Sequence, residues 1–306
     1  MIYNKKINNA LKNNLNKILN KNTKTNVYQL EFQSINTGKN LELQECLFDD
    51  LFPKALISTP ISNIENTDNI WIACSMLSRV SDTTNNLVVL QNDFPSGIVS
   101  AKEILKGLLK NPTPYYFHDV LVEEIMNRKF YLDTREAKLD KILEQMRKTK
   151  SDFVILQNSR QSFSAMSIRE ILEVGALCKS NFEISNLSNK TIKKFRRDDT
   201  VEDIIKLLIQ EDTEFLLLDN ESLFIDSMTI IEKIVNDLNY LKNCDNLLDL
   251  SASVFKLQSP KLIPNNFTLS EISQSMLSMK HPYVMTSNHL FTPRSILEIL
   301  TTGYEN

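Results

Sequence analysis

Glycine is scarce in this sequence, with only 5 Gly among 306 residues. There is no glycine cluster, so the loops that cradle phosphate in P-loop and dinucleotide-binding proteins are excluded. The sequences G-x-S-x-G and H-E-x-x-H, which mark serine hydrolases and zinc proteases, are also absent. Because no set of residues supplies a nucleophile, a base and an electrophile together, we expect no enzymatic activity.

Histidine and cysteine are also few. His118, His281 and His289 are too scattered to predict a metal site or a catalytic triad, and we expect His281 and His289 at the surface. The cysteines lie far apart without a C-x-x-C pair, at Cys46, Cys74, Cys178 and Cys244. This pattern is typical of buried thiols in a reducing compartment rather than of disulfides or zinc ligands.

Long apolar runs are missing as well. No run reaches the roughly 18 residues of a membrane helix, and the N-terminus lacks the features of a secretory signal. We therefore expect a cytoplasmic protein that does not contact a membrane. The net charge of −3 gives no general attraction to nucleic acid.

What the sequence does contain is one pattern repeated four times. A short apolar strand is followed by a polar break, a second apolar patch, and a residue that caps an amphipathic helix. The copies are 87–90 with 97–105, 153–156 with 165–172, 215–218 with 224–231, and 283–285 with 290–297. The helix-opening residues Ser100, Ser167, Asp226 and Thr292 recur at a spacing of about 60 residues, which indicates a repeat architecture.

An extended segment and another amphipathic helix precede the strands in each copy, so each unit is predicted as strand, helix, strand, strand, helix. The expected openings of these first helices are Thr67-Asp68, Thr134, Asp198-Asp199-Thr200 and Thr268. One unit buries too little apolar surface to stand alone, so the units should pair. With a polar seam at 176–186, we predict an extension at 1–50 and two double-repeat modules at 51–178 and 179–306.

The first 50 residues differ from the rest. Apolar residues at helical spacing predict an amphipathic helix at 3–21, and residues 28–43 predict a short hairpin. Lysines decorate the helix, and no acid occurs before Glu31. Such a helix could bind nucleic acid, a membrane surface or an acidic partner. We favour packing of its apolar stripe on the body or on a second subunit.

The repeats resemble CBS domains, which pair into Bateman modules. The best match is 119–175, where 122–126 resembles the family's lead-in to a repeat. Residues 165–172 resemble its ending of glycine, two hydrophobic residues, Ser/Thr, any residue, Arg, Asp and a hydrophobic residue. The resemblance covers about 56–303 and implies an α+β fold of four βαββα repeats in two Bateman modules, after the N-terminal helix and hairpin.

The resemblance also implies binding of an adenosine ligand (AMP, ADP, ATP or S-adenosylmethionine) in clefts between paired repeats, with no cofactor required. In the family pattern, the Ser/Thr that opens the last helix helps to hold phosphate, and an Asp three residues later grips the ribose. A helix N-terminus favours an anion because its N–H groups are unpaired. The candidate ligand-binding residues are Ser100, Lys102, Glu103, Ser167, Arg169, Glu170, Asp226, Thr229, Thr292, Arg294 and Ser295.

The sequence departs from this pattern at the ribose position. Glu103 and Glu170 replace the Asp in the first two repeats, and Thr229 and Ser295 occupy the position in the last two. A serine followed three residues later by Glu is also a capping box, which needs no ligand. Both interpretations, ligand site and helix cap, stay open on the sequence.

Three functions are therefore compatible with the sequence. The first is a non-enzymatic regulatory, energy-sensing protein that binds an adenosine ligand and reports its level to a partner protein. The alternative is a ligand-free scaffold for self-association or partner docking, and in either case we expect a homodimer. The third, a nucleic-acid-associated regulator acting through the Lys-rich helix, is disfavoured by the near-neutral body and the lack of a helix-turn-helix.

Overall fold

The computed structural model describes residues 31–32, 47–52, 62–79, 85–160, 162–180, 192–237, 246–287 and 289–302. The helix predicted at 3–21 lies outside these residues. Of the predicted hairpin, only Glu31–Phe32 (β1) is described, and it pairs in parallel with Lys179–Ser180 (β8). The rest of the hairpin stays a prediction.

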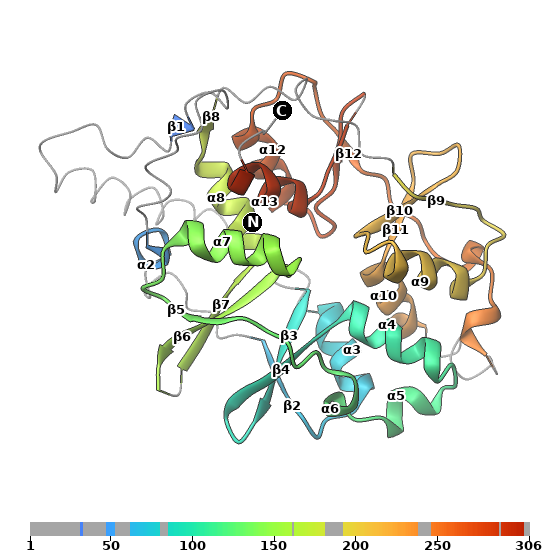
Figure 1. The fold of residues 1–306 in the computed structure, drawn as a ribbon. Coiled ribbons are helices and arrows are strands. Elements are labelled where there is room, and N and C mark those ends of the chain that lie inside the picture. The colour runs from blue at the N-terminus through green and yellow to red at the C-terminus, as the bar shows by residue number, and fades with distance from the viewer. Residues whose placement is uncertain are drawn as a thin grey trace, which may run out of the picture. The chain divides into compact units, whose positions relative to one another are not determined.

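Four copies of strand, helix, strand, strand, helix make up most of the described chain, as predicted (Figure 1). Repeat 1 contains β2 (Asn63–Glu65), α3 (Ile70–Arg79), β3 (Asn86–Gln91), β4 (Phe94–Ser100) and α4 (Ala101–Lys110). Repeat 2 contains β5 (Leu132–Thr134), α7 (Leu139–Thr149), β6 (Phe153–Ser159), β7 (Ser162–Ser167) and α8 (Ile168–Leu177). Repeat 3 contains β9 (Lys194–Phe195), α9 (Val201–Gln210), β10 (Phe215–Leu218), β11 (Phe224–Asp226) and α10 (Ser227–Asn236). Repeat 4 contains β12 (Lys261–Leu262), α12 (Leu269–Leu277), β13 (Val284–Met285), β14 (Leu290–Phe291) and α13 (Pro293–Thr302).

Five shorter elements complete the description: α2 (Phe48–Leu51), α5 (Tyr115–Asp119), α6 (Val122–Ile125), and the 3-10 turns η3 (Leu247–Asp249) and η4 (Ala252–Val254). Each repeat has a three-stranded sheet with its second strand in the centre. In repeats 1 to 3 the first strand runs parallel to the second, and the third runs antiparallel to it. The parallel pair requires a crossover, which α3, α7 and α9 supply.

The described chain forms two compact units, each built from separated stretches of sequence. One comprises Ser62–Phe130 and Asn189–Leu262, and we call it the 1/3 unit after its repeats. The other, the 2/4 unit, comprises the described residues within Met1–Ile61, Tyr131–Ser188 and Ile263–Asn306. The boundaries of the predicted modules, 51–178 and 179–306, do not coincide with these units, because each unit takes one repeat from each half. Pairing of neighbouring repeats in Bateman modules therefore stays a prediction.

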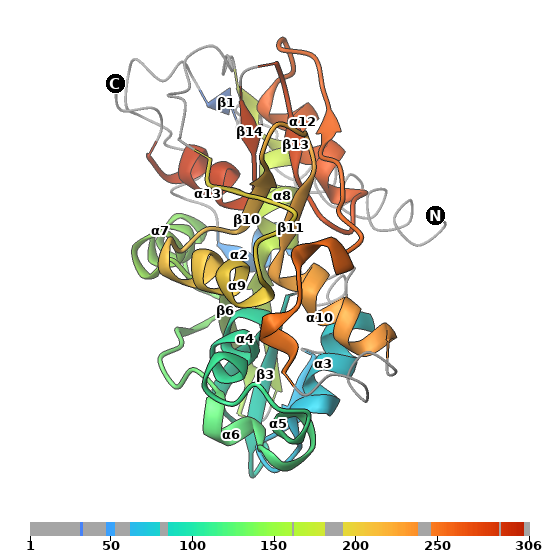
Figure 2. The same ribbon diagram turned by 90° about the vertical axis from the view of Figure 1, so that its right-hand side faces the viewer.

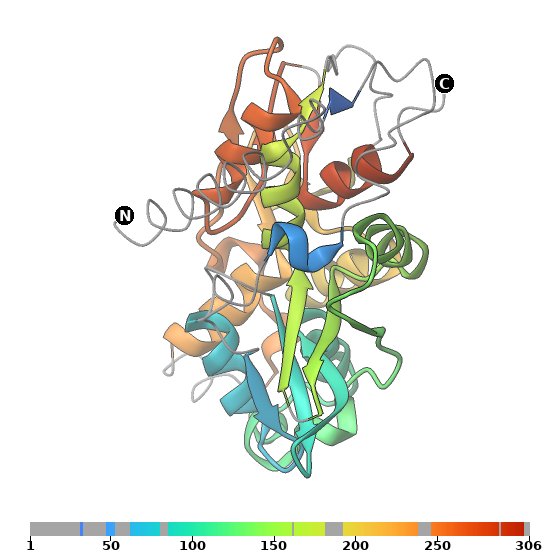
Figure 3. The same cartoon turned by 90° about the vertical axis from the view of Figure 1, so that its left-hand side faces the viewer.

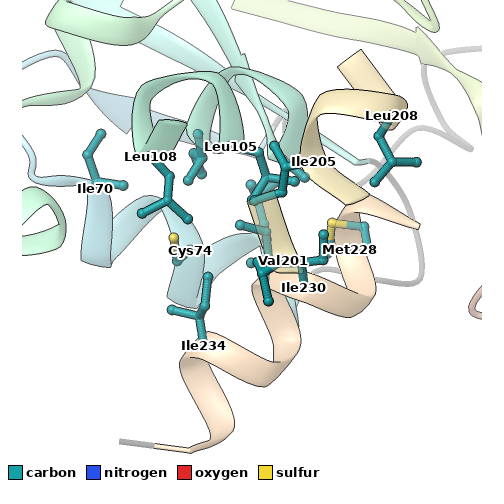
Figure 4. Packing of buried hydrophobic residues seen from close by; sticks show 14 of the residues in the cluster. Ile70, Cys74, Leu105, Leu108, Val201, Ile205, Leu208, Met228, Ile230 and Ile234 are labelled. Atoms are coloured by element: carbon teal, nitrogen blue, oxygen red, sulfur yellow. The ribbon is translucent and has the colours of Figure 1, made fainter. Parts of the chain in front are cut away.

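Four helices form the core of the 1/3 unit. Helix α10 packs against α3 and α4, and α4 packs against α9 (Figures 2 and 4). Apolar residues at helical spacing on each helix give it one buried face. The buried side chains include Ile70, Cys74, Leu105, Leu108, Val201, Ile205, Ile230 and Ile234. The two repeats thus bury in common a face that neither could cover alone.

The 2/4 unit has an equivalent core, in which α8 packs against α12 and α13, and α13 also packs against α7. Gly175 on α8 lies against both α12 and α13. A Cβ atom there would lie 2.4 Å from Ser273 Oγ on α12 and 2.9 Å from Ile296 Cγ2 on α13. The close approach of α8 to both helices therefore requires glycine at this position.

Helix α2 packs on repeat 2, where Figure 3 shows it in blue. The Phe48 amide donates to the Ala137 carbonyl at 3.1 Å. Arg135 is only 2% exposed, and its guanidinium donates to the Asp49 carboxylate and the Phe52 carbonyl. The guanidinium carbon also lies 5.3 Å from the centre of the Phe48 ring. Residues 47–52 are therefore packed into the 2/4 unit, and the extension predicted at 1–50 stays a prediction.

Two of the expected first-helix openings are confirmed. Thr200 and Thr268 are the N-caps of α9 and α12, each with a closed capping box. The other two predictions are wrong. Thr134 ends strand β5, and a turn delays α7 until Leu139. Thr67-Asp68 likewise lies in a turn, where the Asp68 carboxylate accepts from the Glu65 amide, and α3 begins only at Ile70.

The expectation that His281 lies at the surface is also wrong, because its side chain is only 5% exposed. The connection from α12 to β13 turns tightly, with the Tyr283 amide donating to the His281 carbonyl at 2.8 Å. Tyr283 is 6% exposed, so this turn buries both rings. His289, the second histidine expected at the surface, is partly buried.

Replacing Gly175 with Ala should lower the free energy of unfolding by about 1–3 kcal/mol, measured by urea denaturation. Overpacking against α12 and α13 should outweigh the roughly 1 kcal/mol that Ala contributes as the better helix former. Ser273→Ala is the matched control. It removes the nearest atom, a buried hydroxyl without a hydrogen-bond partner, so alone it should cost little. The double variant should be more stable than Gly175→Ala, and a Gly175→Ala protein as stable as wild type would contradict the close packing.

Candidate functional site

Each group of candidate ligand-binding residues lies where the last strand of a repeat meets its last helix. Ser100, Ser167 and Asp226 are the N-caps of α4, α8 and α10, and Thr292 directly precedes α13. The 1/3 unit contains the groups of repeats 1 and 3, and the 2/4 unit contains those of repeats 2 and 4. We describe each group within its own unit.

In repeat 1, Ser100 and Glu103 form a closed capping box at the start of α4. Ser100 Oγ accepts from the Lys102 amide at 3.2 Å, and the Ser100 amide donates to Glu103 Oε2 at 3.2 Å. The Ser100 hydroxyl also donates to Glu103 Oε2. Lys106 Nζ lies 3.7 Å from the second carboxylate oxygen, Oε1. The group satisfies backbone N–H groups that the helix itself cannot pair.

Repeat 2 has the same box at the start of α8. The Ser167 amide and hydroxyl both donate to Glu170 Oε2, at 2.7 and 2.6 Å. Ser167 Oγ in turn accepts from the Arg169 amide at 3.2 Å. In contrast to Ser100, which is partly exposed, Ser167 is only 1% exposed.

The groups of repeats 3 and 4 are caps of a different composition. Asp226 Oδ1 accepts from the amide and the hydroxyl of Thr229, at 2.8 and 2.7 Å, and both residues are buried. In repeat 4, the Ser295 amide donates to Thr292 Oγ1 at 3.2 Å and the Thr292 amide to Ser295 Oγ at 3.3 Å. Repeat 4 offers no carboxylate for a ribose, and the carboxylate of repeat 3 is enclosed.

The basic residues near these caps are held by partners that the sequence did not reveal. Lys102 forms an ion pair with Asp212, and Arg169 Nε donates to Glu173 Oε1 at 3.1 Å. Arg294 donates to the Lys150 carbonyl at 2.8 Å and lies 3.9 Å from Asp152. Asp212 and Asp152 occupy helix–strand turns far away in the sequence, so no local pattern could point to them.

Glu173 is a buried carboxyl in α8, with 8% of its surface exposed. Burial raises its pKa to about 7, and the negative charge of Glu170 adds to this, while the Arg169 guanidinium opposes it. Burial raises the pKa of Glu170 as well, against hydrogen bonds from Ser167. The start of α8 therefore holds two carboxyl groups that ionise less readily than they would in water.

The remaining chemistry of the described residues is limited. No group of three or more His, Cys, Asp or Glu among them could hold a metal ion. No described helix has the length and apolar character required to cross a membrane. Cys74 and Cys178 are free, and burial raises the pKa of both thiols, as expected for inert cysteines. Cys46 and Cys244 lie outside the described residues.

Glu173 should make stability depend on pH. Because its folded pKa of about 7 exceeds the ordinary value of 4.5, the folded protein holds a proton that the unfolded chain releases between these values. The bound proton therefore adds to the free energy of unfolding. This contribution is complete below about pH 4.5 and is lost as the pH rises through 7. Glu173→Gln should therefore stabilise the protein by about 1–3 kcal/mol at pH 8 and change it little at pH 4.5. The measurement is urea denaturation across this range.

The control for this experiment is Glu144→Gln. Glu144 is exposed in α7, and its hydrogen bond from Lys148 lowers its pKa, so any stability that its charge contributes is constant above about pH 4.5 and is lost only in more acidic solution. Parallel stability profiles for wild type and Glu173→Gln would show that Glu173 does not titrate as described.

No family model and no curated protein matches this chain. Among solved structures, protein MJ1225 from Methanocaldococcus jannaschii, a proposed archaeal homologue of γ-AMPK, aligns with a TM-score of 0.69 at 15% identity. The alignment covers 79% of this chain and 97% of that one. An uncharacterized conserved protein from Pyrococcus horikoshii aligns at 13% identity and a TM-score of 0.47, over 71% of this chain and 91% of that one.

A CBS domain protein from Pyrobaculum aerophilum, solved in complex with AMP, aligns at 19% identity and a TM-score of 0.32. This alignment covers 38% of the present chain and 87% of that one. At such identities a structural likeness describes the fold only. The match to MJ1225 extends over nearly all of that protein, and it agrees with the four small mixed sheets described above. The described chain therefore has the fold of four CBS-type repeats.

Proposed function

We propose that this chain is a non-enzymatic regulatory protein that binds an adenosine ligand and reports its level. The observation that carries the proposal is the group at the start of α4. Of the four candidate groups, only this one offers a hydroxyl, a cation and a carboxylate that are all partly exposed, at Ser100, Lys102 and Glu103. The resemblance to CBS domains implies a hydroxyl for phosphate and a carboxylate for the ribose at these positions, and a cation beside them adds attraction for phosphate.

Each residue has a definable role. The N-terminus of α4 and the Lys102 ammonium favour a phosphate group, because both present positive charge. The Glu103 carboxylate suits two vicinal ribose hydroxyls, since a charge-assisted hydrogen bond to each would orient the sugar. Its Oε2 serves the cap, and Oε1 faces Lys106 at 3.7 Å.

The mechanism we propose is a population shift. Helix α4 packs against α9 and α10 of repeat 3, so a ligand that fixes the start of α4 would favour one arrangement of these helices over others. A partner protein would recognise that arrangement. The regulated partner, a homodimer and a cytoplasmic location are all part of this proposal.

The second candidate is a ligand-free scaffold, and a specific observation favours it. In all four repeats the cap side chains already bond one another, and in three of them the N-cap side chain is buried or nearly so. Such groups stabilise helices whether or not a ligand ever binds. A role of the Lys-rich N-terminus in nucleic-acid binding concerns residues outside the described ones and stays a prediction.

AMP, ATP or S-adenosylmethionine at millimolar concentration should raise the thermal unfolding temperature of wild type, because a ligand of the folded state stabilises it.

Glu103→Gln should weaken binding of AMP at least about fivefold, measured by calorimetry, since an amide makes weaker hydrogen bonds to the ribose hydroxyls than a carboxylate. Gln can still close a capping box, so the helix should survive. Glu170→Gln is the matched variant in the more enclosed box of repeat 2. No thermal shift with any of the three ligands would favour the scaffold.

The scaffold makes its own prediction. A protein that works by self-association should form a stable dimer at micromolar concentration in the absence of any nucleotide. Light scattering on the full chain measures this directly. A monomer over the whole accessible concentration range would count against the scaffold while leaving the sensor intact.

A further inference from the structure

The ion pair between Lys102 and Asp212 links the candidate ligand group of repeat 1 to repeat 3. Asp212 lies between α9 and β10 in the left-handed backbone region, at φ 48°. Their side chains are 35% and 31% exposed, so water reaches both. The cation expected to meet a phosphate is therefore already occupied by an anion of the protein itself.

Repeat 4 has a counterpart within the 2/4 unit. Arg294 follows its cap residue Thr292 by two positions, as Lys102 follows Ser100. Arg294 reaches the turn between α7 and β6, where it contacts the Lys150 carbonyl and approaches Asp152. Lys150 has φ 52° and precedes its strand by the same number of residues as Asp212 does. In each unit, then, a cation beside one helix cap contacts the helix–strand turn of the other repeat.

We propose that Asp212 is an internal competitor for the phosphate site of repeat 1. In the absence of a ligand, its carboxylate neutralises Lys102 and ties the start of α4 to the turn after α9. An anionic group bound at the N-terminus of α4 takes over Lys102, so binding of a phosphate breaks the link between repeats 1 and 3. This inference rests on the proposed function. It states how the charge of a bound ligand would change the contact between repeats 1 and 3.

The size of the effect follows from the exposure of the pair. A partly exposed ion pair contributes little net free energy, so an anion can displace it at moderate concentration. Removing the Asp212 charge should then strengthen binding of an anionic ligand about two- to fivefold. A neutral ligand has no reason to displace Asp212, so its affinity should not change. A gain in affinity for the anionic ligand alone would indicate competition, whereas a general loosening of the unit would change the affinity for both ligands.

Asp212→Asn is the appropriate variant. Asn tolerates the left-handed conformation at least as well as Asp and has the same shape, so the turn should keep its geometry. Asp152→Asn is the matched control in the 2/4 unit. Asp152 lies near Arg294 of repeat 4, whose cap group contains no carboxylate. Lys102→Met tests whether the effect of Asp212 passes through Lys102.

Calorimetry on the full chain would measure the affinities of AMP and of adenosine. Asp212→Asn should bind AMP two- to fivefold more tightly than wild type, and its affinity for adenosine should be unchanged. Asp152→Asn should bind both compounds as wild type does. In a Lys102→Met background, Asp212→Asn should not change the affinity for AMP. Unchanged or weaker AMP binding by Asp212→Asn would overturn the inference and leave the proposed function standing, as would an equal gain for adenosine. Absence of AMP binding by wild type and every variant would overturn both.

Discussion

The structure depends on covering the helix faces of very small folding units. A three-stranded sheet with two helices leaves an apolar helix face without a cover, and so few residues cannot bury enough surface to be stable alone. In the 1/3 unit, α3 and α4 cover α10 and α9, and in the 2/4 unit α7 and α8 cover α13 and α12. Each unit is therefore a shared helical core with sheets attached to it. The chain connections are secondary to this core, which is why each unit can be assembled from distant stretches of sequence.

This origin of stability explains what the sequence could and could not predict. The order of elements in each repeat follows from local periodicity, because alternate or four-residue spacing of apolar side chains is visible in a short window. The choice of partner repeat is not local. The helices of the four repeats all present apolar faces, and single contacts distinguish one partner from another. Examples are the contact of Gly175 in α8 with Ser273 in α12, and the ion pair of Lys102 with Asp212.

The candidate sites show the same division. Sequence reasoning located all four helix caps, and the structure places every one of them at the start of the last helix of its repeat. It could not tell which of them are accessible, because exposure depends on how the two repeats of a unit pack. It named Lys102 and Arg294 as candidate ligand-binding residues, but it did not reveal that each contacts a turn of the other repeat in its unit. The packing of α2 on repeat 2 had no sequence signal, since the buried guanidinium of Arg135 and the backbone hydrogen bond from Phe48 to Ala137 join residues far apart in the sequence.

A closed capping box is compatible with a ligand, and the reason lies in the carboxylate itself. In both Glu103 and Glu170, the bonds to the cap residue use Oε2. An ionised carboxylate accepts hydrogen bonds at two oxygens, so Oε1 keeps its capacity after the cap is made. Repeats 1 and 2 therefore have the same cap residues, and their cap groups differ in exposure to solvent and in how readily the carboxyl group ionises. Ser100 is partly exposed, whereas Ser167 is enclosed and the pKa of Glu170 is raised by burial, which opposes the charged form that a ribose contact would need. Replacement of the family's Asp by Glu does not abolish the site of repeat 1, because the cap and the proposed ligand would use different oxygens of one side chain.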